Sequence, residues 1–188
     1  MFPEIQSALR LDKHSIQNKR ITLVQELSID GSFLLHHFIS SAVKSNFNIL
    51  IVALEQTLGH FHGVGMKLGY DLLKCQKKGQ LIFYDVLKSA HLSYLNDPQN
   101  NSNTNHVLDF HSESSKTLNE LFKVVKAKVE EFTDKSKPLI IIIDKLSLFL
   151  SLGVKLSQLI NFIQSLQMLA EEKDASLGNI QKQLSIKS

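Results

Sequence analysis

The chain has 188 residues, of which 43% are hydrophobic, enough for one domain core, and its 21 basic and 18 acidic side chains leave a net charge of only +3, which permits a nucleic-acid partner without indicating one. A single cysteine, Cys75, excludes an intrachain disulfide framework and indicates a structural thiol in a reducing compartment. No stretch approaches the roughly 18 apolar residues of a membrane span, and Glu4 and Arg10 interrupt the apolar run that a secretory signal needs.

The first half of the chain alternates short apolar runs with amphipathic stretches. A buried strand is expected at Ile21–Val24, followed by a helix at Phe33–Lys44 and a second strand at Asn48–Leu54. A further helical stretch ends near Gly69 and leads to a third strand at Gln80–Leu87. Strands and helices therefore alternate from the first element onwards.

The second half begins with a polar segment rich in asparagine, for which we expect a mobile surface loop over residues 96–117. Helical spacing follows in the apolar residues Leu118, Leu121, Phe122, Val125, Val129 and Phe132. A strand at Leu139–Ile143 then closes on Asp144. A last helix is marked by Leu156, Leu159, Ile160, Ile163 and Leu166. After Leu169 no convincing strand remains, so the sheet is expected to stop early.

Alternating strands and helices predict an α/β fold with a mostly parallel sheet covered on both faces. A P-loop or RecA-like domain is the leading interpretation, and we place it over residues 1–170. Residues 171–188 are interpreted as a polar, divergent C-terminal tail. Because the predicted sheet stops early, we expect either that a partner covers its edge or that this polypeptide is a shortened form.

The segment Ile21–Lys44 is built like a nucleotide-binding strand, loop and helix, but it lacks the residues that hold a phosphate. A cradle of the GxxxxGK[ST] kind needs glycines whose N–H groups wrap the anion, a lysine and a hydroxyl. If Gly31 is the second glycine, the first glycine, lysine and hydroxyl positions are Glu26, Ser32 and Phe33. A carboxylate repels a polyphosphate, and a phenyl ring cannot ligate a cation. The sequence therefore predicts degenerate, non-functional Walker motifs in a RecA-like fold.

Two acids at predicted strand ends are the remaining candidates for nucleotide chemistry. Asp144 would hold magnesium through water in a working ATPase, or else it caps the turn into Leu146–Gly153. Glu55, beside Gln56, stands where RecA- and KaiC-like ATPases keep the acid that activates water, or else it is solvated or contacts a neighbouring subunit. Without a phosphate loop we expect no catalytic residue, no cofactor and no metal. An active ATPase that uses Glu55 and Asp144 is the alternative.

Histidines and the cysteine are poorly arranged for chemistry. His36 and His37 are adjacent on a predicted helix and point about 100° apart, which hinders sharing a metal. His60 and His62 have no acidic or cysteine companions, so surface histidines are the expectation. No base is positioned to activate Cys75, although three lysines near it could lower its pKa: Lys74, Lys77 and Lys78.

A row of lysines in the second half could form a basic strip: Lys123, Lys126, Lys128, Lys135 and Lys137. Lysines at such spacing usually form the solvated face of a helix. Direct RNA contact is the alternative interpretation.

Four motifs carry a resemblance to a known family. They are DGSFLLHHFIS at Asp30–Ser40, VALEQTLGHFHGVGMKLG at Val52–Gly69, GQLIFYDVLKSA at Gly79–Ala90 and IDKLSLFLSLG at Ile143–Gly153. Together, with the same spacing as far as about Gln167, they closely resemble the sixth subunit of the Elongator complex. The resemblance implies a RecA-like, ATPase-derived fold without Walker motifs. The tail departs from the family pattern, which indicates a C-terminally shortened form.

The resemblance also implies a function. Members of the family assemble with the fourth and fifth Elongator subunits into a hetero-hexameric ring, which binds tRNA and docks on the subunits that modify the wobble uridine at carbon five. For this chain it implies a non-catalytic scaffold role without a cofactor or a membrane partner, in the cytoplasm, with a nuclear location left open. An isolated RNA-binding protein is a third interpretation. The small net charge and the absence of an aromatic stacking motif disfavour it.

Overall fold

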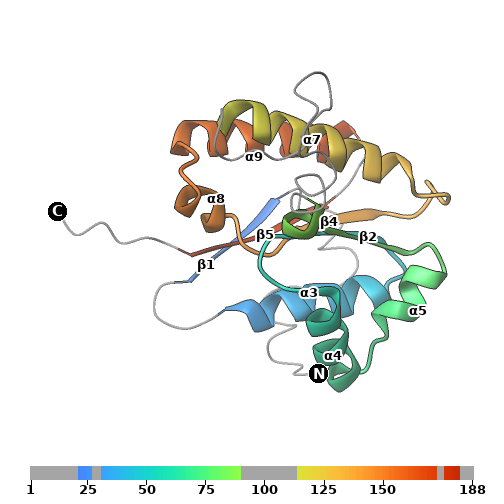
Figure 1. Ribbon diagram of the computed structural model, residues 1–188. Helices are drawn as coiled ribbons and strands as arrows, with labels where there is room; N and C mark the ends of the chain where they lie inside the picture. Colours follow the sequence, from blue (N-terminus) through green and yellow to red (C-terminus); the bar gives the residue numbers. More distant parts are fainter. Residues whose placement is uncertain (1–20, 27–30, 90–113, 173–175, 183–188) are drawn as a thin grey trace, which may run out of the picture.

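Five strands form a single sheet in this computed structural model, which describes residues 21–26, 31–89, 114–172 and 176–182. The strands are β1 (Ile21–Glu26), β2 (Asn48–Ala53), β3 (Leu81–Asp85), β4 (Leu139–Ile143) and β5 (Ser176–Lys182). Every neighbouring pair is parallel, and the order across the sheet is β1-β5-β4-β2-β3 (Figure 1). The predicted parallel α/β architecture is confirmed, and it is compatible with a RecA-like fold.

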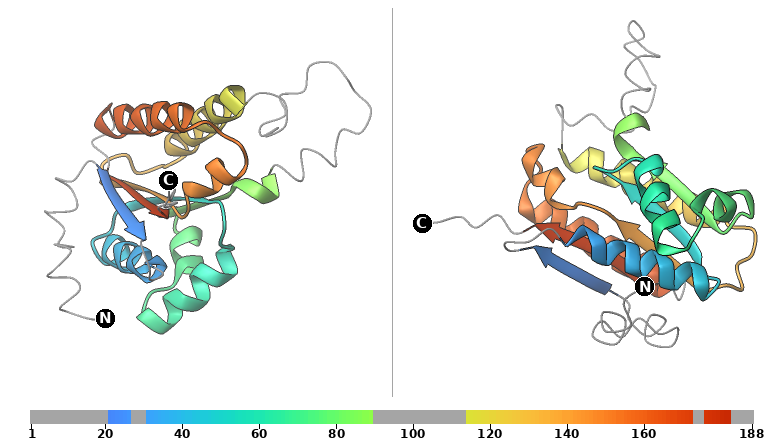
Figure 2. Two further views of the ribbon diagram at one scale, coloured as in Figure 1. Left: turned by 90° about the vertical axis from the view of Figure 1, so that its left-hand side faces the viewer. Right: turned by 90° about the horizontal axis from the view of Figure 1, so that it is seen from below.

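Helices cover both faces of this sheet (Figure 1, Figure 2). On one face lie α3 (Ser32–Lys44), α4 (Leu58–Leu68) and α5 (Leu72–Lys77). On the other face lie α7 (Ser114–Glu130), α8 (Ser147–Ser151) and α9 (Leu156–Glu172). The short helices α5 and α8 were not predicted, because five or six residues are too few to show a helical period.

Strand β2 explains why the sheet needs two helical layers. All six of its residues are buried. Leu50 and Val52 join the core beneath α7 and α9, whereas Ile49 and Ile51 join the core beneath α3, α4 and α5. Successive side chains of a strand point to opposite faces, so a strand covered on both sides is apolar almost throughout; the polar first residue, Asn48, donates a hydrogen bond to the Asp134 carbonyl.

The expectation that no strand follows Leu169 is wrong. Strand β5 lies in the middle of the sheet, between β1 and β4, with Leu177 beside Ile21 on one neighbour and Ile141 on the other. Its sequence, SLGNIQK, includes Gly178 and Asn179, which have weak strand propensity. Hydrogen bonding to a strand on each side stabilises β5 in spite of this weak propensity. The division into a domain over 1–170 and a tail stays a prediction, although β5 lies beyond residue 170.

Two predicted boundaries also differ from the structure. Strand β3 ends at Asp85 rather than Leu87, because the Asp85 carboxylate accepts a hydrogen bond from the Lys88 N–H (2.8 Å) and starts a helical turn over residues 86–89. Helix α7 begins at Ser114, inside the predicted loop, and Thr117 is buried. The rest of that loop, residues 96–113, lies outside the described residues.

Candidate functional site

The carboxyl ends of β2 and β4 form the place where a sheet of this kind usually binds its ligand. Strand β2 is followed by α4 on one face of the sheet, and the neighbouring β4 is followed by α8 on the other face (Figure 1). Parallel sheets bind ligands where adjacent connections diverge in this way. Both predicted acids lie here, since Glu55 follows β2 and Asp144 follows β4.

Asp144 is occupied by the backbone of its own chain. Its Oδ1 accepts a hydrogen bond from the Leu54 N–H (2.7 Å), and its Oδ2 accepts from the N–H groups of Glu55 (3.0 Å) and Gln56 (2.9 Å). The residue is only 8% exposed. The interpretation that Asp144 caps the turn into Leu146–Gly153 is therefore wrong, because its bonds fasten the end of β2 to β4 instead.

The electrostatics of this site agree with a structural carboxylate. Burial raises the pKa of Asp144, the three peptide N–H groups lower it again, and the nearby charge of Glu55 raises it, with the net direction upward. Glu55 itself forms an ion pair with Lys145, the residue after Asp144. Sequence reasoning missed Lys145, although its place beside Asp144 was a signal. Neither acid is left without a partner inside the chain.

The structure describes the start of α3 but not the preceding loop, so the degenerate phosphate loop stays a prediction. Glu26 ends β1, residues 27–30 lie outside the described part, and Ser32 and Phe33 open α3. The Phe33 side chain is 47% exposed and lies edge-on to the ring of His37, with 6.2 Å between the ring centroids. An apolar ring therefore stands in the first turn of this helix.

The two histidines of α3 are buried, whereas His60, one of the two histidines expected at the surface, is exposed. His36 and His37 are both buried, and a hydrogen bond of 2.9 Å joins His36 Nδ1 to the Tyr70 hydroxyl. Burial, followed by the charges of His60 and His37, lowers the pKa of His36 to about 4. Burial also lowers the pKa of His37. The neutral imidazole of His36 thus lies between α3 and α4, against the ring of Phe61.

The described residues contain no group of three potential ligands that could hold a metal ion. His62 lies 3.7 Å from the Asp71 carboxylate, at the turn between α4 and α5. Cys75 is a buried free thiol whose pKa is raised by burial, so the prediction of a structural cysteine is confirmed.

Four lysines of the predicted basic strip are bound to acids of the chain. Each forms an ion pair with a neighbour in sequence: Lys123 with Glu120 (2.7 Å), Lys128 with Glu131 (2.7 Å), Lys135 with Glu130 (2.8 Å) and Lys137 with Asp134 (3.3 Å). The fifth, Lys126, is exposed on α7. The strip is therefore mixed in charge rather than uniformly basic. Its contact with RNA stays a prediction.

A model of the family described as Elongation complex protein 6 matches residues 2–182 of the chain. The chain belongs to this family. It is 33% identical over 168 residues to Elongator complex protein 6 of Rattus norvegicus and to that of Mus musculus, covering 87% of this chain and 62% of each relative. The Homo sapiens protein of the same name is 32% identical over 167 residues, covering 87% and 61%. The chain thus spans about three fifths of the length of these relatives.

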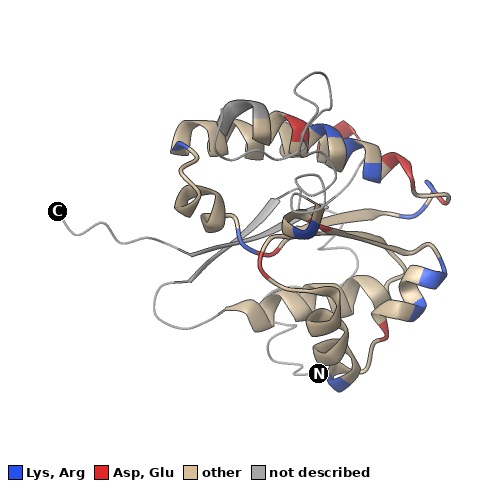
Figure 3. Ribbon diagram, in the orientation of Figure 1, with Lys and Arg blue, Asp and Glu red and all other residues tan. Residues whose placement is uncertain are grey.

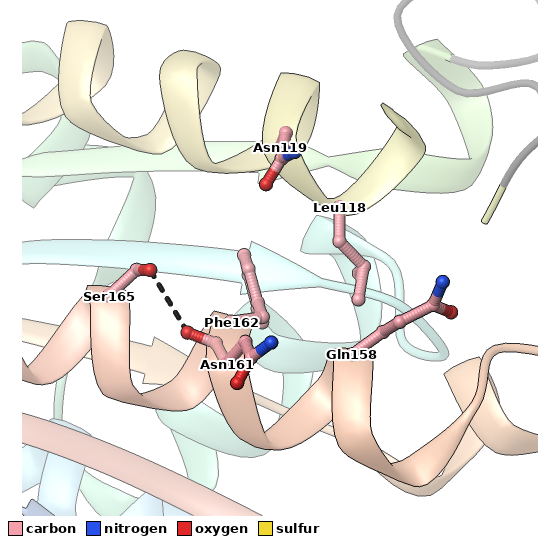
Figure 4. A pocket seen from close by; sticks show the side chains of 6 residues that line it. All are labelled: Leu118, Asn119, Gln158, Asn161, Phe162 and Ser165. Atoms are coloured by element: carbon pink, nitrogen blue, oxygen red, sulfur yellow. Dashed lines mark hydrogen bonds between the residues drawn. The ribbon is translucent and has the colours of Figure 1, made fainter. Parts of the chain in front are cut away.

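This member of the Elongation complex protein 6 family has a small hollow between α7 and α9, of about 130 Å³. Figure 4 shows Leu118 and Asn119 reaching it from α7, and four residues from α9: Gln158, Asn161, Phe162 and Ser165. The Ser165 hydroxyl donates a hydrogen bond to the backbone carbonyl of Asn161 (2.9 Å). The lining has amides and a hydroxyl but no titratable group, so it offers no acid or base for catalysis.

The outer face of α9 is a feature that sequence reasoning missed. Leu156 (57% exposed), Ile160 (45%) and Met168 (70%) lie outside, although Leu156 and Ile160 belong to the apolar spacing that predicted this helix. The stretch from Leu156 to Ala170 contains no charged residue, whereas charges run along α7 (Figure 3). The absence of charge over fifteen residues was the available signal. In the described part of the chain, no helix is both long and apolar enough to span a membrane.

Proposed function

We propose that the chain is a non-catalytic scaffold subunit of the Elongator complex. In this proposal it joins the fourth and fifth Elongator subunits in a hetero-hexameric ring that binds tRNA and supports modification of the wobble uridine at carbon five. The proposed location is the cytoplasm, with the nucleus as a second site. The proposal is supported by membership of the Elongation complex protein 6 family and by the name of its relatives, which describes a protein of the Elongator complex.

The bonding of Asp144 is the observation that carries the non-catalytic part. A working ATPase needs this acid free to hold the hydrated magnesium of the nucleotide. Here its two oxygens accept three backbone N–H groups of residues 54–56, and Glu55 is paired with Lys145. Activating either acid would require breaking bonds that fasten β2 to β4. The site is better suited to holding the sheet together than to turning over a nucleotide.

The outer face of α9 supports the assembly part. Large apolar side chains that remain exposed along an uncharged helix are typical of protein–protein contacts. Leu156 and Ile160 are one helical turn apart, and Met168 lies two turns further along the same side. We assign this face to contact with the fourth or fifth Elongator subunit. An assembly then gains affinity from several modest surfaces rather than from one deep pocket.

Native mass spectrometry of the 188-residue chain co-expressed with the fourth and fifth Elongator subunits tests the assembly. A six-chain particle containing two copies of the chain is expected. A chain that stays monomeric in the presence of both subunits would overturn the ring proposal.

A nucleotide assay separates the scaffold from the ATPase alternative. We expect the purified chain to release no phosphate from ATP above a blank without protein, both alone and with the two subunits. Hydrolysis that disappears in Glu55→Gln would show that the chain is an enzyme, whatever its state of assembly. The Gln variant keeps the size of the side chain, so a loss of hydrolysis would report the carboxylate rather than a gap.

A further inference from the structure

Two groups of lysines in the described chain differ in their partners. Those on α7 and the loop after it are mostly paired with carboxylates, as described above. Four others lie on α4 and α5, and all are exposed: Lys67, Lys74, Lys77 and Lys78. No ion pair joins any of these four to an acid in the described residues. In Figure 3 the blue segments gather at α5 and at the end of α4.

The segment that forms α4 and α5 carries more positive than negative charge. Residues 56–84 hold four lysines and one acid, Asp71, so the segment carries a net charge of +3 with neutral histidines. This equals the net charge of the whole chain, and the remaining residues balance to zero. Asp71 forms no ion pair with these four lysines: its carboxylate accepts a hydrogen bond from the Lys74 backbone N–H (2.9 Å) and lies 3.7 Å from His62. Lysines therefore outnumber acids by four to one along α4 and α5.

The packing of α5 holds three of these lysines on one side. Leu72 and Cys75 are buried against the sheet at spacing i, i+3, which fixes the inner face of this short helix. Lys74, Lys77 and Lys78 follow the spacing i, i+3, i+4, so their side chains are neighbours on the outer face. Like charges at this spacing repel and destabilise a helix when no acid separates them. A bound polyanion would remove that repulsion.

We propose that the α4–α5 lysine surface, made of Lys67, Lys74, Lys77 and Lys78, binds the phosphate backbone of RNA. Clustered lysines without partners neutralise phosphates and release counterions, and they read no base sequence. This inference rests on the proposed function, because it names the face of the subunit that meets tRNA. It assigns the RNA contact to α4 and α5, beside β3, rather than to the row of lysines on α7 and the loop after it, four of which are paired with acids.

Fluorescence anisotropy of labelled tRNA, titrated with the 188-residue chain and with the co-expressed ring at several salt concentrations, tests this surface. The test variant is the triple change Lys74→Gln, Lys77→Gln and Lys78→Gln. The control is Lys123→Gln, Lys126→Gln and Lys128→Gln on α7, which removes the same number of charges, two of them (Lys123 and Lys128) from ion pairs. Thermal unfolding of each variant confirms that it is folded, because lysines near the carboxyl end of a helix also stabilise that helix.

We expect the α5 triple variant to bind tRNA at least about tenfold more weakly, and its salt dependence to fall by about two in the slope of log K against log salt. The α7 control should change binding by less than about threefold. Equal losses in the two triple variants, or no tRNA binding by the unmodified chain at low salt, would overturn the proposal. The chain alone is titrated as well as the ring. Failure to form a ring would therefore count against the proposed function, while RNA binding by the α4–α5 lysine surface would still be tested.

Discussion

The carboxyl ends of β2 and β4 and the outer face of α9 each hold side chains that are unusual for their position. In the first region a carboxylate, Asp144, is buried; in the second, apolar side chains such as Met168 are exposed. The buried carboxylate accepts hydrogen bonds from three peptide N–H groups of its own chain. The exposed face of α9 finds no such cover among the described residues.

This difference separates side chains whose contacts are all made within the chain from side chains that remain available for contact with a partner. A buried polar group needs hydrogen bonds inside the molecule, because water cannot reach it, and an unpaired one is destabilising. An exposed apolar group tolerates water until another surface covers it. We therefore expect changes at Asp144 to act on stability and changes on α9 to act on assembly.

The largest expected effect is on stability, from Asp144→Ala. The change leaves three N–H groups of residues 54–56 without their acceptor, which should lower the free energy of unfolding by about 3 to 5 kcal/mol. Urea denaturation measures it. Asp134→Ala serves as control, because this exposed acid caps only its own loop, and it should lower the free energy by about 1 kcal/mol or less. Similar effects of the two changes would show that the β2–β4 connection does not depend on Asp144.

Acidification tests a second buried polar group, His36. Its pKa is lowered from 6.5 to about 4 in the folded state, so the unfolded chain binds the proton first as pH falls. Stability is therefore fully present above pH 6.5 and is lost toward pH 4, by at most about 3 kcal/mol from this residue. Urea midpoints across that range measure the loss. His36→Gln should flatten the curve in part, since His37 also titrates. A curve parallel to that of the unmodified chain would contradict this assignment.

The α9 face should respond in assembly and not in stability. Ile160→Glu combined with Met168→Glu places two charges on exposed positions, which should weaken association with the fourth and fifth Elongator subunits at least about tenfold. The free energy of unfolding should stay within about 0.5 kcal/mol for each change. Ala127→Glu on the exposed side of α7 is the matched control. Native mass spectrometry measures assembly, and urea denaturation of the same samples measures stability. Assembly that survives the double change, or a loss of folding, would contradict the comparison.

The smallest expected effect is that of Glu55→Gln. The ion pair with Lys145 is partly exposed, with 45% of the Glu55 side chain and 25% of the Lys145 side chain open to water, so its loss should lower the free energy of unfolding by about 1 kcal/mol or less. The effect should shrink further at high salt, because screening weakens exposed pairs. Chemical denaturation at two salt concentrations measures it. A loss as large as that of Asp144→Ala would mean that the ion pair holds β2 to β4 as strongly as the hydrogen bonds that Asp144 accepts from residues 54–56.

The amphipathic and apolar periods in the sequence were sufficient to predict α3, β2, α7, β4 and α9, because these patterns are local and each element buries one face or both. The same logic failed for β5, whose Gly178 and Asn179 give no strand signal. It also failed for the exposed positions of α9, since a spacing that fits a helix does not say which side another element covers. Of the candidate site, the two acids could be predicted, but their partners could not.

The sequence by itself determined the alternation of strands and helices, the apolar strands that require cover on both faces, the family, and the uncharged length of α9. Only the tertiary structure decided that β5 lies between β1 and β4, that Asp144 binds N–H groups about ninety positions earlier, and that His36 and His37 are buried. It also decided which lysines meet an acid. Periodicity follows from the geometry of a single element, whereas hydrogen-bond partners and charge neutralisation depend on which distant elements become neighbours in the sheet.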